Sequence, residues 1–323
     1  MGHTKKAKNT FLMEVEYRLF LLIPLLIRAL SLKHAYALAK VCAQLFYMAD
    51  FKHRKRAVTH ILHSGIRTTL PEAKALARAN FLHMLKVFVE VVKCDQIVTE
   101  ENYHEHFRYE SDSPELDKMI DPEHPVTAIL ASAHLGNWEL AGNIYTLMSG
   151  QNLCSIMRPL ANQKLGEYFY THRMSKKHTT VSKEKGIRPL LAALNRGDSI
   201  AIVSDQHASS REGVEITFFG HPARAHMSVA LLHLKTGHPI LPILAVREDD
   251  NYHFKLTGTA PIRYTPTGDK EHDIREITQL YSNAFEELIR KYPDQWLWAH
   301  RRWLDCNRNN QKKDDANDKK TGY

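Results

Sequence analysis

The chain has 323 residues, 43% of them hydrophobic, and a formal net charge of +8, which excludes a disordered or fibrous protein. The basic balance favours anionic partners, such as a membrane surface, a phosphorylated substrate or an acidic protein. Basic clusters interleaved with aromatic residues are missing, so we expect no nucleic-acid binding, and the four widely spaced cysteines are expected to be reduced thiols.

The N-terminal third is predicted to be helical. Residues 1–10 are basic and polar and are expected to be mobile, whereas residues 11–110 are predicted to form a helical, membrane-associating region. Its longest apolar run is LFLLIPLLI at residues 19–27, with an arginine on each side. Since a spanning helix needs about 20 apolar residues, this run predicts either a buried core helix or an interfacial helix.

Residues 111–306 alternate short β-rich runs with helical segments, which predicts an α/β domain with a mixed, largely parallel sheet flanked by helices. Residues 307–323 have almost no apolar side chains and are expected to be disordered. The predicted strands are 126–131, 153–157, 179–181, 199–203, 214–219, 240–246 and 253–259, and the predicted helices are 140–148, 163–176, 187–195, 227–236 and 272–292.

The stretch ASAHLGNWELA at residues 131–141 ends a predicted strand on His134. Ligands of open α/β sheets bind beyond the carboxyl ends of the strands, so His134 is expected to lie in a site. Gly136 permits a turn that brings Glu139, in the first helical turn, back to the imidazole. We predict that His134 is a general base oriented by a hydrogen bond to Glu139. The alternative is a helix-capping histidine and a surface glutamate.

No GxSxG nucleophile motif occurs in the sequence, which favours direct attack by a substrate hydroxyl over a covalent enzyme intermediate. Attack on an acyl carbonyl creates an oxyanion that needs hydrogen-bond donors. Backbone amides and Asn137 are the candidates for these donors.

Five blocks of sequence, taken together and in this order, resemble the bacterial lipid A late acyltransferases, the lauroyl/myristoyl family of lysophospholipid-acyltransferase type. The resemblance covers residues 10–305. It implies a glycerol-phosphate-acyltransferase-like fold at the cytoplasmic face of an inner membrane. It also implies transfer of an acyl chain from acyl carrier protein to a hydroxyl of a Kdo-bearing lipid A precursor, with no metal or organic cofactor. The blocks are HLGNWE, MRPLAN, LNRGDSIAIVSDQ, FFGHPA and QWLWAHRRW.

The resemblance also implies roles for single residues. His134 matches the family's base and Glu139 its relay acid. Arg158 suits a phosphate or carboxylate of the acceptor, held by two parallel hydrogen bonds. Three further residues are predicted to bind substrate: Asn137, Asp205 and Gln206. Asp205 and Gln206 have the alternative role of holding the shape of the site, and Asp205 that of capping a turn.

Aromatic and arginine residues in the last two blocks predict an acyl groove or a membrane-facing surface, where rings lie at headgroup level and cations meet phosphates. The alternative for the last block is a packed C-terminal segment. The candidates are Phe218, Phe219, Trp296, Trp298, Arg301 and Arg302. No recognisable metal-ligand spacing occurs among the histidines at 207, 221, 226, 233 and 238, so no metal site is predicted.

Members of this family commonly carry a longer apolar N-terminal anchor than residues 19–27, so we expect interfacial rather than spanning attachment. Three rival functions stay open. The first is acyl-CoA-dependent acylation of another glycolipid or lysophospholipid. The second is a thioesterase, if water replaces the acceptor, and the third is an inactive membrane-bound scaffold.

Overall fold

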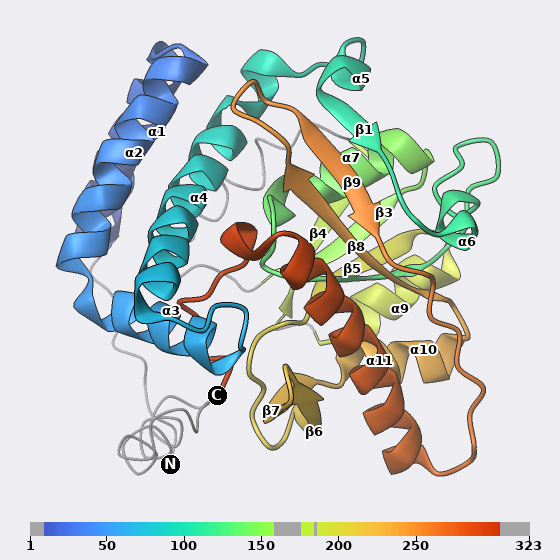
Figure 1. Cartoon of the computed structure of the whole chain (residues 1–323). Helices are drawn as coiled ribbons and strands as arrows, with labels where there is room; N and C mark the ends of the chain where they lie inside the picture. Colours follow the sequence, from blue (N-terminus) through green and yellow to red (C-terminus); the bar gives the residue numbers. More distant parts are fainter. Residues whose placement is uncertain (1–9, 158–175, 184–185, 304–323) are drawn as a thin grey trace.

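The computed structural model describes residues 10–157, 176–183 and 186–303. Its centre is a seven-stranded sheet with the order β1-β9-β8-β2-β5-β3-β4, flanked by helices (Figure 1). All neighbouring strands of this sheet run parallel except β8 and β9, which are antiparallel. The predicted fold class, a mixed and largely parallel sheet flanked by helices, is confirmed.

The strands agree closely with the predicted ranges, and two were missed. β1 has three residues, too few for a pattern, and β7 has the sequence HPARAH, which is poor in β-branched side chains. β7 forms because it pairs with β6 in a separate two-stranded sheet. The strands are β1 Phe107–Tyr109, β2 Ile129–Ser132, β3 Leu153–Met157, β4 His178–Ser182, β5 Ser199–Val203, β6 Gly213–Phe218, β7 His221–His226, β8 Ile240–Arg247 and β9 Phe254–Gly258.

The four longer helices described in the α/β part follow the predicted ranges, whereas the two four-residue helices α5 and α6 were not predicted. The predicted helix at 163–176 lies almost wholly outside the described residues. The helices of this part are α5 Tyr103–His106, α6 Pro114–Asp117, α7 Trp138–Ser149, α9 Arg188–Asn195, α10 Ser228–Thr236 and α11 Lys270–Lys291, followed by the short η2 Pro293–Gln295.

Alternation along the strands gives the sheet two apolar faces. In β2, Ile129 belongs to the core that α9, α10 and α11 cover, whereas Leu130 belongs to the core that α7 covers. Both faces are therefore buried, as is usual for a parallel sheet.

Four helices form the N-terminal part: α1 Thr10–Ala29, α2 Leu32–Ala49, α3 Phe51–His63 and α4 Leu70–Ile97. α4 begins with a capping box in which Thr69 and Glu72 satisfy each other's backbone amides. α4 lies between α1 and α2 on one side and the sheet on the other (Figure 1). Since β1 joins the sheet at Phe107, the sheet begins inside the predicted helical region 11–110.

The outer side of α1 and α2 exposes large apolar side chains. Within the described residues, no helix combines the length and the apolar character that crossing a membrane requires. The run at 19–27 forms part of α1, and its leucines at 22, 25 and 26 are 60%, 62% and 53% exposed. Together with Phe51, the first residue of α3, these side chains form a set that we call the apolar face: Leu22, Ile23, Leu25, Leu26, Val41, Leu45, Phe46, Met48 and Phe51.

Candidate active site

The sheet brings two distant residues together at the carboxyl ends of neighbouring strands. β2 and β5 are parallel, and Ser132 is the partner of Val203 in their register. His134 and Asp205 each follow two residues later, so they leave the sheet side by side although 71 residues separate them in the chain. The site therefore lies where the sequence predicted it, beyond the strand ends.

His134 and Asp205 form a hydrogen-bonded pair. Asp205 Oδ1 accepts from His134 Nδ1 at 2.7 Å, and Asp205 Oδ2 accepts from the His134 backbone N–H at 3.0 Å. Trp296 Nε1 donates to the same Oδ2 at 2.8 Å. With Nδ1 donating, the lone pair of His134 Nε2 accepts from the Gln206 amide nitrogen at 3.2 Å. The pair thus presents Nε2 as a base, and 21% of the His134 side chain is exposed.

The two residues shift each other's pKa. Burial alone would lower the pKa of His134, but the charge and hydrogen bond of Asp205, with a smaller effect of the Glu139 charge, raise it above 6.5. Burial would raise the pKa of Asp205, but the charge and hydrogen bond of His134 and the Trp296 hydrogen bond hold it well below its usual range. Asp205 is therefore ionised near neutral pH.

Glu139 occupies the first turn of α7, as predicted, and lines the same cavity as His134. Its carboxylate accepts a hydrogen bond from Trp138 Nε1 at 3.1 Å, and the Trp138 ring lies 5.1 Å from that of His134. The prediction that Glu139 orients the imidazole is wrong, because Asp205 occupies Nδ1. Asp205 was itself a candidate, but as a substrate ligand; its side chain is buried and bonded within the protein.

A tight turn connects His134 to α7. Gly136 has φ +65°, and a Cβ there would lie 2.1 Å from the carbonyl oxygen of Ala245, so only glycine fits. Asn137 then caps α7 by accepting from the Leu140 N–H at 3.0 Å, and its amide donates to Glu90 at 2.8 Å. Because Asn137 is fully buried and bonded at both ends, its predicted roles in substrate binding and as an oxyanion donor are wrong.

Buried polar side chains of α4 form hydrogen bonds to this turn and to the residues beside it. His83 Nε2 donates to the Gly136 carbonyl at 3.1 Å, and Asn80 donates to the Trp296 carbonyl at 2.5 Å. Glu90 accepts from Asn137, from Tyr36 of α2 and from Arg247 at the end of β8. One feature of the sequence could have indicated these contacts. Polar residues interrupt the apolar pattern of α4 at Asn80, His83 and Glu90.

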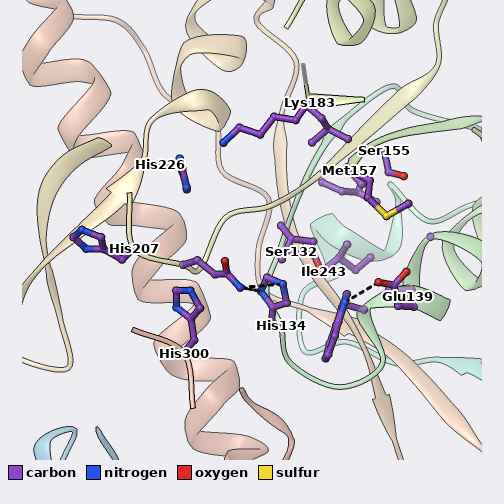
Figure 2. Close-up of a pocket in the computed structure, with 18 of the residues that line it drawn as sticks. Ser132, His134, Glu139, Ser155, Met157, Lys183, His207, His226, Ile243 and His300 are labelled. Atoms are coloured by element: carbon purple, nitrogen blue, oxygen red, sulfur yellow. Dashed lines mark hydrogen bonds between the residues drawn. The ribbon is translucent and has the colours of Figure 1, made fainter. Parts of the chain in front are cut away.

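A cavity of about 570 Å³ opens beside His134. Figure 2 shows His134 near its middle, with Glu139 on one side and His207, His226 and His300 on the other. One part runs between α7 and the strands; we call this the apolar arm. Small or apolar side chains form it: Leu130, Ser132, Ala201, Val203, Ser155 and Ile243 from the sheet, and Ala141 and Gly142 from α7.

The other part of the cavity, the polar arm, carries titratable side chains. Burial is the main reason that the pKa of His300 falls to about 3, and burial also lowers the pKa of His226. Both rings are therefore neutral, and the positive charge of this arm comes from Lys183 and Arg301. Glu212 accepts a hydrogen bond from Lys183 at 3.2 Å.

The structure corrects most of the predicted groove and membrane-facing residues. Phe218, Phe219, Trp296, Trp298 and Arg302 are each at most 5% exposed and lie in the core, so they form neither a groove wall nor a membrane-facing surface.

For Trp296, Trp298 and Arg302 the alternative given for the last block, a packed C-terminal segment, is correct, and Phe218 and Phe219 are core residues at the end of β6. Arg302 donates to the carbonyls of Gln206 and Arg224 and lies over the Phe218 ring. Arg301 and Gln206 line the cavity, and Arg158 lies outside the described residues.

The sequence of this chain matches a known family over most of its length. The model of the family described as bacterial lipid A biosynthesis acyltransferase matches residues 4–305. The protein therefore belongs to this family of acyl-group transferases.

Individual relatives match a shorter part. Phosphatidylinositol mannoside acyltransferase of Mycobacterium tuberculosis is 26% identical over 180 residues, which are 55% of this chain and 54% of that protein. The protein of the same description from Mycolicibacterium smegmatis is 25% identical over 181 residues, 55% of this chain and 57% of its own. Lipid A biosynthesis palmitoleoyltransferase of Escherichia coli is 24% identical over 177 residues, 54% of this chain and 55% of its own. These matches span about half the length of each relative.

Proposed function

We propose that this protein is a membrane-associated O-acyltransferase. It moves a fatty acyl chain from a thioester on acyl carrier protein to a hydroxyl of a Kdo-bearing lipid A precursor. The observation that carries the proposal is the His134–Asp205 pair, whose Nε2 faces a cavity with an apolar arm on one side and a polar arm on the other. Membership of the lipid A acyltransferase family supports the substrate class.

The proposed reaction follows from the tautomer of His134, in which Nδ1 carries the proton and Nε2 the lone pair. The acceptor hydroxyl replaces the Gln206 amide at His134 Nε2 and gives up its proton to this nitrogen as its oxygen attacks the thioester carbonyl. The tetrahedral intermediate then collapses, the C–S bond breaks, and the leaving thiolate takes the proton from Nε2. Asp205 stays ionised throughout and stabilises the imidazolium formed between the two steps.

A donor for the oxyanion is available beside the base. The Ser132 hydroxyl is buried in the cavity wall and has no hydrogen-bond partner among the described residues. It is therefore free to donate to the thioester oxygen. Glu139 contributes negative charge that raises the pKa of His134, and we propose this as its role.

The cationic side chains of the polar arm suit a phosphate of a glycolipid acceptor, which would compete with Glu212 for Lys183. Lys183 and Arg301 line the polar arm, and we propose that Arg158 adds a bidentate contact to a phosphate or carboxylate. The net charge of +8 would favour association with an acidic carrier protein.

A second candidate is acyl-CoA-dependent acylation of another glycolipid. It is favoured by the matched relatives described as phosphatidylinositol mannoside acyltransferases. The same base and the same polar arm serve either acceptor.

The decisive experiment offers the purified protein each donor with each acceptor in detergent and follows the acceptor by mass spectrometry. We expect one acyl unit or more to be added to the lipid A precursor from acyl carrier protein, and no addition by His134→Ala. Transfer only from acyl-CoA to a mannosylated phosphoinositide would establish the second candidate. Thioester consumption with an unchanged acceptor would establish hydrolysis, and no consumption by any pair would favour a scaffold.

We also propose that the apolar face binds the cytoplasmic surface of an inner membrane. Leu25 and Phe46 are 62% and 54% exposed on α1 and α2, beyond what a water-exposed helix normally carries. Lys52 and Lys55, exposed on the adjoining α3, would lie near anionic headgroups. The arrangement is that of an interfacial attachment.

The double variant Leu25→Glu/Phe46→Glu tests this proposal. We expect binding to anionic vesicles to weaken at least about tenfold, since each buried apolar side chain contributes roughly 1.5–3 kcal/mol. Vesicle co-sedimentation measures it. Leu280→Glu is the matched control, because Leu280 is 41% exposed on α11, away from α1 and α2 in Figure 1. Equal binding by both variants and the unaltered protein would contradict the proposal.

A further inference from the structure

The apolar arm runs across the sheet from β8 towards β4. Its lining comes in turn from Ile243 of β8, Leu130 of β2, Ala201 of β5 and Ser155 of β3, which follow one another in the strand order. α7 covers it from the other side. β4 is the edge strand, so an arm that continued past β4 would leave the sheet.

His178, the first residue of β4, stands at this end. It lines the cavity, and its ring fills the space between the edge of the sheet and α7. A Cβ added to Gly142 would lie 2.3 Å from His178 Cε1, so the ring rests directly on the backbone of α7. Gly142 is not needed for its backbone angles here; its missing side chain makes room for the ring.

Hydrogen bonds on both ring nitrogens hold His178 in this position. Nε2 lies 2.9 Å from Ser155 Oγ of β3, and Nδ1 lies 3.1 Å from Asn143 Oδ1 of α7. Asn143 is buried, and His178 itself is 8% exposed. A ring bonded to the sheet on one side and to the helix on the other cannot turn aside for a ligand without losing both bonds.

We propose that His178 is the end wall of the acyl-binding arm and thereby limits the length of the fatty acyl chain that the protein accepts. The inference rests on the proposed acyl transfer and deepens it. A chain whose thioester carbonyl lies beside His134 extends along the apolar arm beneath α7, and its terminal methyl group meets the His178 ring. Chains that are too long must displace the ring or leave the arm.

His178→Ala removes the wall. In the unaltered protein, a chain two methylenes longer than the preferred one should be transferred roughly tenfold more slowly, or slower still. Packing against a rigid wall discriminates by about this factor for each added methylene. We expect the variant to lose this rejection and to transfer the longer chain best. His178→Phe keeps a flat ring that is somewhat larger but lacks the nitrogens, so it should still exclude the longer chain. His178→Ser is the substitute if the alanine variant does not fold, because its hydroxyl can still bond to Asn143 or Ser155.

The control is His233→Ala. His233 is also buried, with its Nδ1 bonded to the His238 carbonyl at 2.7 Å, but it lies on α10, outside the cavity lining. It should lower stability without changing the length preference.

Two readouts separate this inference from the proposed function. One is transfer from a series of acyl donors graded by two carbons, followed by mass spectrometry of the acceptor. The other is direct binding of the corresponding fatty acids to protein carrying His134→Ala, by native mass spectrometry. If His178→Ala binds longer fatty acids than the protein with His178 but no acyl transfer occurs, the wall is supported and the proposed reaction is overturned. Transfer with the same length preference in His178→Ala would overturn the wall alone, and absence of both binding and transfer would overturn both.

Discussion

Asp205→Asn should lower the rate of acyl transfer about 10²–10⁴-fold, the range that a general base normally supplies. The asparagine is nearly the same size, so the turn that holds His134 should stay folded. Its side chain, however, lacks the charge that stabilises the imidazolium, and its amide group can hold the ring in the other tautomer. Glu139→Gln, at the residue that the sequence pattern favoured, should cost much less, because Glu139 bonds to Trp138 and reaches His134 only through its charge.

The pH dependence of the rate gives this prediction a second readout. The base works only when His134 is neutral, so the rate rises with pH through the pKa of His134, which Asp205 raises above 6.5. Without that carboxylate the pKa falls, and the acid limb of the profile should move to lower pH even though the plateau is lower. Initial rates across a pH series measure both effects. If His134→Ala is inactive but Asp205→Asn loses no more of its rate than a substitution at an exposed residue does, another group orients the base.

The position of His134 beyond a strand end was predictable from the sequence, and its pairing with Asp205 was not. The apolar run before His134 and the glycine at 136 predict a strand end followed by a turn, as the structure has it. Glu139 is the nearest carboxylate in the sequence. The pairing with Asp205 depends on β2 lying beside β5, and β3 and β4 intervene between them in the chain. Local pattern carries no information on that adjacency.

The aromatic block at the C-terminus shows a different limit. Tryptophans beside arginines suit a membrane interface and a packed segment equally well by composition. In the fold, the Leu297 N–H donates to the His134 carbonyl at 2.9 Å, and Trp296 donates to Asp205. The block is therefore packed against the His134–Asp205 pair, an arrangement that only the tertiary contacts reveal.

Glu90→Ala should lower the free energy of unfolding by about 3–5 kcal/mol, the usual cost of leaving one member of a buried ion pair uncompensated. Glu90 is fully buried and pairs with Arg247, whose side chain is 8% exposed. The same carboxylate accepts from Tyr36 at 2.9 Å and from Asn137 at 2.8 Å, so its loss leaves several buried donors without a partner. Urea denaturation followed by circular dichroism measures the effect. The double variant Glu90→Leu/Arg247→Met should recover part of the loss, because it removes both charges.

An exposed ion pair on α11 serves as the control for this loss of stability. Glu287 lies 3.0 Å from Lys291 on α11, with side chains 55% and 42% exposed, so Glu287→Ala should cost at most about 1 kcal/mol. Similar losses of unfolding free energy in Glu90→Ala and Glu287→Ala would contradict the importance of the buried pair.

The buried carboxylate of Glu90 is also expected to affect the rate of the reaction. Glu90 joins Tyr36, on the helix that carries part of the apolar face, to Asn137 in the turn after His134. Glu90→Gln, a milder change, should therefore lower the rate of acyl transfer at temperatures where the protein is still fully folded.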